Sequence, residues 1–306
     1  RAFGGAQIGI APGTNNYINP FDINLENRDD EGGKSPLTIK NELITSLLEI
    51  MIGGKFGLSP IQEAIIDRCN REIFTPFVHK LQVENKTIDM DANPTLRDFY
   101  EVLQEQPEPE AVEMTLALDK YVNGYSDTFA RKTTVSSNNR FVVYDIRDIG
   151  DMKEVGSHIC LDNIWTRMIE NKAKGKRTWV YIDEFHLLMK NPSSAKYIAE
   201  IWKRARKFYG VPMAITQNVQ DMLANEDAIT VINNCSFVCL LGQAPINRDE
   251  LSRMYDISPA EKKYISTAKP GMGLLKIQDY LIPMVDEFPK NTKLYKIMST
   301  KPGEVV

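Results

Sequence analysis

The 306 residues are enough for one large domain or two modest ones, and an apolar content of 42% is ordinary for a globular protein. A net charge of −4 argues against a chain coated in nucleic acid, although local basic patches are compatible with it. Four cysteines are too few for a disulfide scaffold, three scattered histidines show no metal spacing, and no apolar run approaches the roughly 20 residues that span a bilayer. We therefore expect a cytoplasmic protein without its own membrane span.

The first 36 residues combine short extended segments with a linker. Residues 6–12 resemble a strand, and Tyr17–Ile23 is an extended segment that an Asn-Pro step keeps out of the helical region. Residues 24–36 are acidic and contain glycine, which is typical of an exposed linker.

Residues 37–130 have a helical pattern. A capping-box sequence at Ser59 marks one helix start, and Thr95–Asp98 opens another helix. The expected first helix has apolar residues at the spacing of one buried face, and a fourth helix runs through a second apolar set: Leu43, Ile44, Leu47, Leu48 and Met51 in the first, and Val112, Leu116, Leu118 and Val122 in the fourth. We predict an all-helical insertion over 37–130 in a core made of residues 1–36 and 131–306.

After residue 140, short apolar segments alternate with helical ones. We expect strands at 141–146, 179–182, 211–216 and 237–241, helices at 151–171, 194–209, 218–233 and 246–256, and three more short strands at 273–277, 280–285 and 292–298. In the fourth strand, Cys235 and Cys239 share a face with Phe237, which favours core packing over metal ligation. The fold class predicted is α/β, with a mostly parallel sheet and helices on both faces.

The apolar run from Thr178 to Ile182 ends in two adjacent acids, Asp183 and Glu184. A carboxylate at the end of a buried strand needs a cationic partner, and Mg²⁺ bound to a triphosphate would supply one. This pattern is typical of a Walker B strand, in which Asp183 faces Mg²⁺ through a water and Glu184 acts on the attacking water. The alternative is a strand that ends in a solvated acidic turn.

The next expected strand runs directly into Thr216, Gln217 and Asn218. An amide at the carboxyl edge of a neighbouring strand is placed to sense the γ-phosphate or the attacking water, and Gln217 is our candidate. In the simpler interpretation, Thr216 or Asn218 caps the following helix. Both interpretations are compatible with each other.

Residues 165–210 hold 11 Lys and Arg against 4 Asp and Glu, a local charge of +7. Arg206 and Lys207, with Arg204 next, are candidates to reach the phosphates of a neighbouring subunit as an arginine finger. The same stretch could contact DNA phosphates, or could be a solvated helix end whose cations suit the helix dipole.

No G-x-x-x-x-G-K-[ST] phosphate-binding loop occurs in the sequence. The nearest lookalike, Gly33-Lys34-Ser35, has Arg28 in place of the first glycine and Pro36 where a helix should continue, so we interpret it as a solvated loop. We expect the missing loop to lie upstream of Arg1.

The order of these motifs resembles the C-terminal ATPase domain of the VirB-four/TraE-like conjugative transfer family, the ATPases of type IV secretion systems. The resemblance covers nearly the whole chain and rests on Asn19-Pro20-Phe21-Asp22, Asn123–Phe129, Tyr144-Asp145-Ile146, Tyr181–His186, Arg206-Lys207, Thr216-Gln217-Asn218, Gly242-Gln243, Pro270–Gly273 and Phe288–Tyr295.

The resemblance implies a RecA-like P-loop NTPase core, ATP and Mg²⁺ as cofactors, and self-association, with a hexamer as one option. It assigns Asp183 to the Mg²⁺ side, Glu184 to catalysis, Gln217 to sensing and Arg206-Lys207 to the basic motif. We also predict that Arg204 and Gln243 contribute to the nucleotide site.

The family further implies other type IV secretion components as partners and a position at the inner face of the cell membrane. Two alternatives stay open. One is a DNA-pumping coupling protein or translocase of the same superfamily, which would contact DNA through residues 165–210. The other is a non-catalytic assembly scaffold, which the missing phosphate-binding loop favours and the intact Asp183-Glu184 pair opposes.

Overall fold

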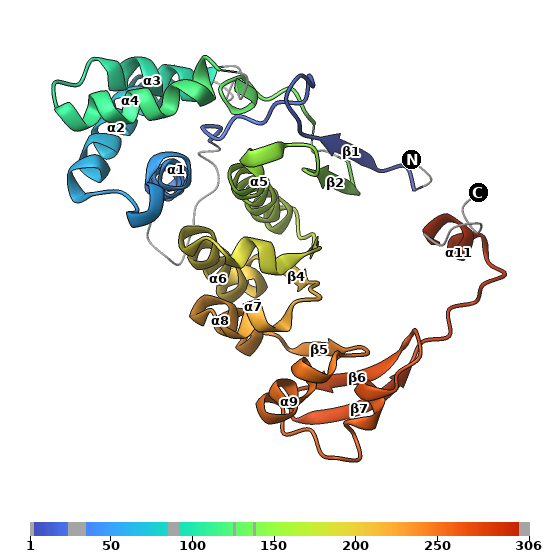
Figure 1. Cartoon of the computed structure of the whole chain (residues 1–306). Helices are drawn as coiled ribbons and strands as arrows, with labels where there is room; N and C mark the ends of the chain where they lie inside the picture. Colours follow the sequence, from blue (N-terminus) through green and yellow to red (C-terminus); the bar gives the residue numbers. More distant parts are fainter. Residues whose placement is uncertain (1–2, 24–34, 85–91, 125–126, 137–138, 300–306) are drawn as a thin grey trace. The chain divides into compact units, whose positions relative to one another are not determined.

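A computed structural model describes residues 3–23, 35–84, 92–124, 127–136 and 139–299. The chain divides into two compact units, Phe3–Ile215 and Thr216–Val306, and each is described by itself. Figure 1 gives the course of both units. None of the helices in the described ranges has the length and apolar character that crossing a bilayer requires.

The first unit contains four packed helices (Figure 1): α1 (Pro36–Ile52), α2 (Pro60–Glu84), α3 (Leu96–Gln104) and α4 (Pro109–Val122). The predicted capping box at Ser59 forms, since the Gln62 side chain accepts from the Ser59 amide at 2.8 Å. The predicted helix start at Thr95 also has a capping box, in which the Asp98 carboxylate accepts from the Thr95 amide at 2.6 Å. The buried face of α1 is the predicted one. The limits of the insertion itself stay a prediction.

On α4 the expected apolar set is only half correct. Leu118 and Val122 are buried, but Val112 is exposed and Leu116 has 74% of its surface exposed. The buried positions of α4 are Ala111, Met114, Leu118, Tyr121 and Val122, which follow the helical spacing from Ala111. This face joins a core shared with α1, with strand β1 (Ala6–Gly9) and with helix α5 (Lys153–Ala173), so the helices do not fold around a separate core.

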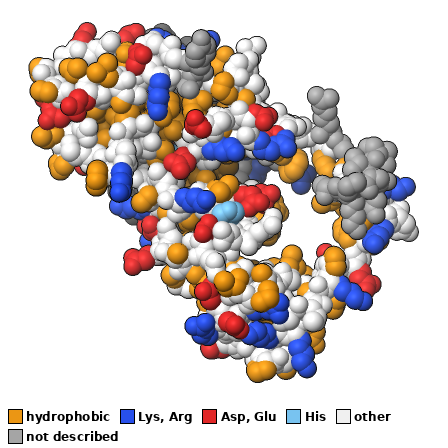
Figure 2. Space-filling view, in the orientation of Figure 1, with side chains coloured by type: hydrophobic (Ala, Val, Ile, Leu, Met, Phe, Trp, Pro, Cys, Tyr) orange, Lys and Arg blue, Asp and Glu red, His pale blue; other side chains and the backbone are white. Residues whose placement is uncertain are grey.

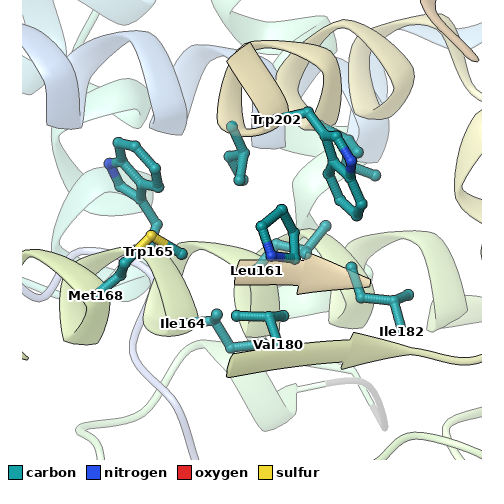
Figure 3. Close-up of a pocket in the computed structure, with 10 residues that line it drawn as sticks. Leu161, Ile164, Trp165, Met168, Val180, Ile182 and Trp202 are labelled. Carbon is teal, nitrogen blue, oxygen red and sulfur yellow. The ribbon is translucent and has the colours of Figure 1, made fainter. Parts of the chain in front are cut away.

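Two parallel strand pairs belong to the first unit. β1 (Ala6–Gly9) pairs with β2 (Val142–Asp145), and β3 (Thr178–Ile182) pairs with β4 (Gly210–Ala214). One face of the β3–β4 pair is covered by α5 (Lys153–Ala173) and α6 (Pro192–Ala205), as Figure 3 shows for the residues between them. The other face carries exposed apolar side chains, Trp179 and Tyr181 from β3 and Met213 from β4, and Ile215 just past β4.

Gly210, at the start of β4, explains how closely α5 approaches the strands. A β-carbon at this position would lie 2.3 Å from the Met168 sulfur on α5. The chain reaches Gly210 from α6 through a short 3₁₀ helix, Arg206–Phe208, and through Tyr209 in a left-handed conformation (φ 56°).

Polar groups are buried where α1, α5 and α6 meet. The Lys40 ammonium lies 2.9 Å from the Asp162 carboxylate and also donates to the Pro20 carbonyl at 3.2 Å. His158 on α5 is fully buried against the ring of Tyr197 on α6, with ring centroids 4.7 Å apart. Burial, with a smaller contribution from Lys40, lowers the pKa of His158 to about 4.

The second unit contains α7 (Val219–Leu223), α8 (Glu226–Asn233), α9 (Pro245–Met254), α10 (Lys263–Ser266) and α11 (Lys293–Met298), with strands β5 (Phe237–Leu240), β6 (Met272–Ile277) and β7 (Tyr280–Val285). The strands form an antiparallel sheet in the order β5-β6-β7. Gly273 allows β6 to approach β5, because a β-carbon there would lie 2.3 Å from the Leu240 carbonyl oxygen.

Three predictions for this unit are wrong in detail. Residues 292–298 form α11, with the Thr292 side chain capping the Tyr295 amide, instead of a strand. The helix expected over 218–233 is broken into α7 and α8 at the cap residue Asn225. The face of β5 with Cys239 and Phe237 is not core, since Cys239 is exposed and Phe237 is 65% exposed; Leu240 packs inward instead.

Candidate active site

The acids that follow β3 lie at the carboxyl end of a parallel pair. Ile182 is in register with Ala214, and the Ile215 amide donates to the Ile182 carbonyl at 2.9 Å. The Phe185 amide then donates to the Ile215 carbonyl, also at 2.9 Å. These two bonds bracket Asp183 and Glu184, so β4 fixes the backbone on which both carboxylates are carried.

The turn itself exposes the acids and buries the residue after them. Glu184 has left-handed backbone angles (φ 49°, ψ 42°), which cost a residue with a β-carbon about 1–2 kcal/mol. Phe185 is fully buried and its ring lies 5.1 Å from that of Trp202 on α6. Phe185 anchors the turn to α6. The Asp183 side chain is exposed, and its Oδ1 accepts a hydrogen bond from the Glu184 amide at 3.0 Å.

A third side chain reaches this turn. His186 lies in the 3₁₀ helix η5 (Phe185–Met189), and its Nδ1 is 3.5 Å from Oε2 of Glu184. The His186 side chain is 13% exposed, whereas that of Glu184 is 44% exposed. The sequence pattern Tyr181–His186 includes His186 but predicts no role for it. Its position two residues after a candidate catalytic acid is the feature that could have indicated one.

The predicted cations lie at the opposite end of the same strands. Arg206 and Lys207 belong to the 3₁₀ helix that precedes Gly210, and Arg204 is in the last turn of α6. β4 has five residues from Gly210 to Ala214, so at about 3.3 Å per residue the strand is roughly 13–16 Å long. Within one chain, these cations are therefore not gathered with Asp183 and Glu184.

Arg204 has an evident packing role. Its guanidinium lies 5.4 Å from the centre of the Trp165 ring and 5.6 Å from the centre of the Phe208 ring. The Lys172 ammonium also lies over the Phe208 ring, 4.8 Å from its centre. Such cation–π contacts favour stabilisation of α5 against α6. On the face shown in Figure 2, Lys and Arg side chains are interspersed with acids and do not form one continuous basic field.

The predicted amides belong to the second unit. Gln217 is exposed, two residues past Ile215, and Asn218 caps α7 by accepting from the Asp221 amide at 3.2 Å. The simpler capping interpretation of Asn218 is thus confirmed. The Gln243 side chain donates to the Leu241 carbonyl at 3.2 Å, and the Gln243 backbone carbonyl accepts from Arg248 Nε at 3.0 Å. The roles of Gln217 and Gln243 at a nucleotide stay predictions.

A small cavity under the strand pair is not a nucleotide site. It is lined by apolar side chains of α5, β3, α6 and β4, among them Leu161, Val180 and Trp202 (Figure 3), and offers no polar group to a phosphate. No cluster of three or more His, Cys, Asp or Glu fit for a metal occurs among the described residues.

The half-buried strand β3, the acids that follow it and the parallel partner strand β4 fit an α/β core with helices packed on parallel strands. The chain belongs to the TraG P-loop domain family, which residues 114–288 match. No match was found among curated protein sequences.

Solved structures share the fold. VirB4 of Thermoanaerobacter pseudethanolicus aligns with a TM-score of 0.79 at 22% identity, over 94% of this chain and 78% of that one. The plasmid coupling protein TrwB in complex with ADP and Mg²⁺ aligns with a TM-score of 0.55 at 13% identity, over 94% and 76% of the two chains. A sulphate-bound form of the conjugative coupling protein TrwBdeltaN70 gives 0.54, also at 13% identity, over 92% and 73%. The RecA-like fold and the resemblance to a VirB4/TraG-like conjugative ATPase domain are confirmed.

Proposed function

We propose that this chain is the catalytic core of an ATPase that energises conjugative or type IV secretion, through channel assembly or transfer of DNA or protein. Family membership and the fold shared with VirB4 support it. The observation that carries it is the turn after β3, where the exposed Asp183 and the half-exposed Glu184 follow the strand while hydrogen bonds to Ile215 hold the backbone.

The two carboxylates fit different parts of a Mg²⁺–ATP site. Asp183, at the very end of β3, is placed to hold a water of Mg²⁺, which when bound neutralises charge on the β- and γ-phosphates. Glu184, one residue further, is placed to orient the attacking water and accept its proton. Gln217 would sense the γ-phosphate from the segment after β4. The phosphate-binding loop that completes such a site has no counterpart in these 306 residues.

The basic residues fit a role between subunits. Since Arg206 and Lys207 lie at the far end of β3 and β4 from Glu184, we assign them to the site of a neighbouring copy in an oligomer. Arg204 is better explained by its aromatic contacts, and Gln243 is kept as a nucleotide-site candidate. Other secretion components are the expected further partners.

A DNA-pumping coupling protein is the second candidate, favoured by the fold shared with TrwB and by the cations of residues 165–210. A motor that grips DNA through these cations would bind it with an affinity that falls steeply as salt rises. Weak binding with little salt dependence would favour the secretion ATPase.

The test is steady-state ATP hydrolysis by the full-length protein under oligomer-forming conditions. Glu184→Gln should lower kcat by about 10²-fold or more, because the amide cannot accept the proton, and should leave nucleotide binding intact. Glu200→Gln is the matched control, since Glu200 is an exposed glutamate on α6 that pairs with Lys203. A wild type that does not hydrolyse ATP would replace this proposal with the non-catalytic scaffold.

A further inference from the structure

We propose that His186 is a positioning residue that holds the carboxylate of Glu184 through its Nδ1 nitrogen. The inference rests on the proposed ATPase function and adds a residue to that same site. Its basis is the 3.5 Å separation of Nδ1 and Oε2, together with the way the turn after β3 is built.

The two partners differ in freedom. His186 has only 13% of its side chain exposed, so the surrounding residues restrict the imidazole. Glu184 is 44% exposed and has three side-chain torsions, so without a partner its carboxylate would sample several positions. A mostly buried imidazole beside a half-exposed carboxylate limits the positions that the carboxylate can take.

The backbone is shaped to bring these partners together. The left-handed angles at Glu184 reverse the chain as β3 ends, and the Leu187 amide closes the turn by donating to the Glu184 carbonyl at 2.9 Å. Phe185, buried between the two polar residues, fixes η5 to α6 through Trp202. The mostly buried His186 and the half-exposed Glu184 therefore meet at an anchored turn.

Fixing the carboxylate matters for an in-line attack on a phosphate. A water must be held at a defined angle and distance, and a misplacement of about 1 Å can lower a rate by on the order of 10²-fold. The contact is slightly long for a strong hydrogen bond, which is common for catalytic groups before the substrate tightens the site. His186 acts on the water through Glu184, so its removal should lower kcat and leave the KM for ATP unchanged.

A pair of amide substitutions separates positioning from packing. In His186→Asn the amide nitrogen takes the place of Nδ1, whereas in His186→Gln it takes the place of Nε2 and faces away from Glu184. We expect kcat of the Gln variant of the full-length protein to fall roughly 10-fold or more below that of the Asn variant, with KM and Tm alike in the two. In a Glu184→Gln background, the further change His186→Gln should have no additional effect on kcat, because the two residues act as one unit.

Equal kcat values for the Asn and Gln variants would overturn the proposal, as would losses that follow Tm or nucleotide affinity. The failure of the wider function has a different signature: the wild type would lack ATP turnover, or Glu184→Gln would behave like Glu200→Gln, and both proposals would then fall. An active wild type, an inactive Glu184→Gln variant and equal His186 variants would overturn the positioning role alone.

Discussion

The two ends of the β3–β4 pair are built in different ways. At the carboxyl end, Asp183 and Glu184 are held by the backbone, in a left-handed turn bracketed by hydrogen bonds to Ile215. At the amino end, Arg204 is held by side-chain packing on Trp165 and Phe208. A backbone-held acid keeps a fixed place and stays exposed, whereas an aromatic-packed cation is partly withdrawn from ligands. The length of β4, roughly 13–16 Å, separates the two sets.

The strongest test of this comparison is complementation between subunits. Arg206→Ala should lower kcat by roughly 10³-fold if Arg206 completes the site of a neighbour. Mixed in equal amounts with the Glu184→Gln variant, it should recover about one quarter of wild-type activity, because one site in four then pairs an intact Glu184 with an intact Arg206. ATP turnover of the mixture, with each variant measured alone, is the readout.

Lys203→Ala is the control for the complementation, because Lys203 lies three residues before Arg206 and pairs with Glu200 at 2.8 Å. It should leave turnover near the wild-type level. An inactive Arg206→Ala variant that Glu184→Gln fails to rescue would mean that both ends act in one chain, contrary to the separation along the strands.

The sequence located the acids and the cations but not the distance between them. Asp183 and Glu184 follow an apolar run, and the helix starts at Ser59 and Thr95 are local signals, so each could be found without knowing the fold. Their separation from Arg206 follows from parallel pairing, which joins residues about 30 apart in sequence.

Faces were harder to predict than elements. A period of two shows that Phe237 and Cys239 share a face of β5, but it cannot say which face α9 and α10 cover. The last helix was mistaken for a strand because six residues fit either period, and the cap at Thr292 decides between them. The contact between His186 and Glu184 depends on a left-handed turn, which the residue types do not announce.

Both ends of the β3–β4 pair rest on helices α5 and α6, which pack together at the buried His158. Acid should weaken this packing. The pKa of His158 is lowered to about 4 in the folded protein, below the ordinary value near 6.5 in the unfolded chain. As the pH falls, the unfolded chain therefore binds the proton first. The contribution of neutral His158 to the free energy of unfolding is fully present above pH 6.5 and is lost as the pH falls toward 4, by up to about 3 kcal/mol. Denaturant unfolding at several pH values should show this loss.

His158→Leu should remove that part of the pH dependence, since the variant has no imidazole to protonate. The comparison is between the slopes of unfolding free energy against pH for wild type and variant, because buried carboxylates such as Asp22 contribute to both. Equal slopes between pH 4 and 6.5 would show that His158 is not a source of acid sensitivity.

The smallest effect is expected at the amino end. Arg204→Lys keeps the charge and loses the planar group that lies over Trp165 and Phe208, so it should lower the free energy of unfolding by about 1 kcal/mol. Because that contact is to packing residues, kcat should stay near the wild-type value. If kcat falls while the free energy of unfolding is unchanged, Arg204 belongs to a nucleotide site, as the sequence suggested. The last turn of α6 would then act together with Arg206 and Lys207 and would not serve packing alone.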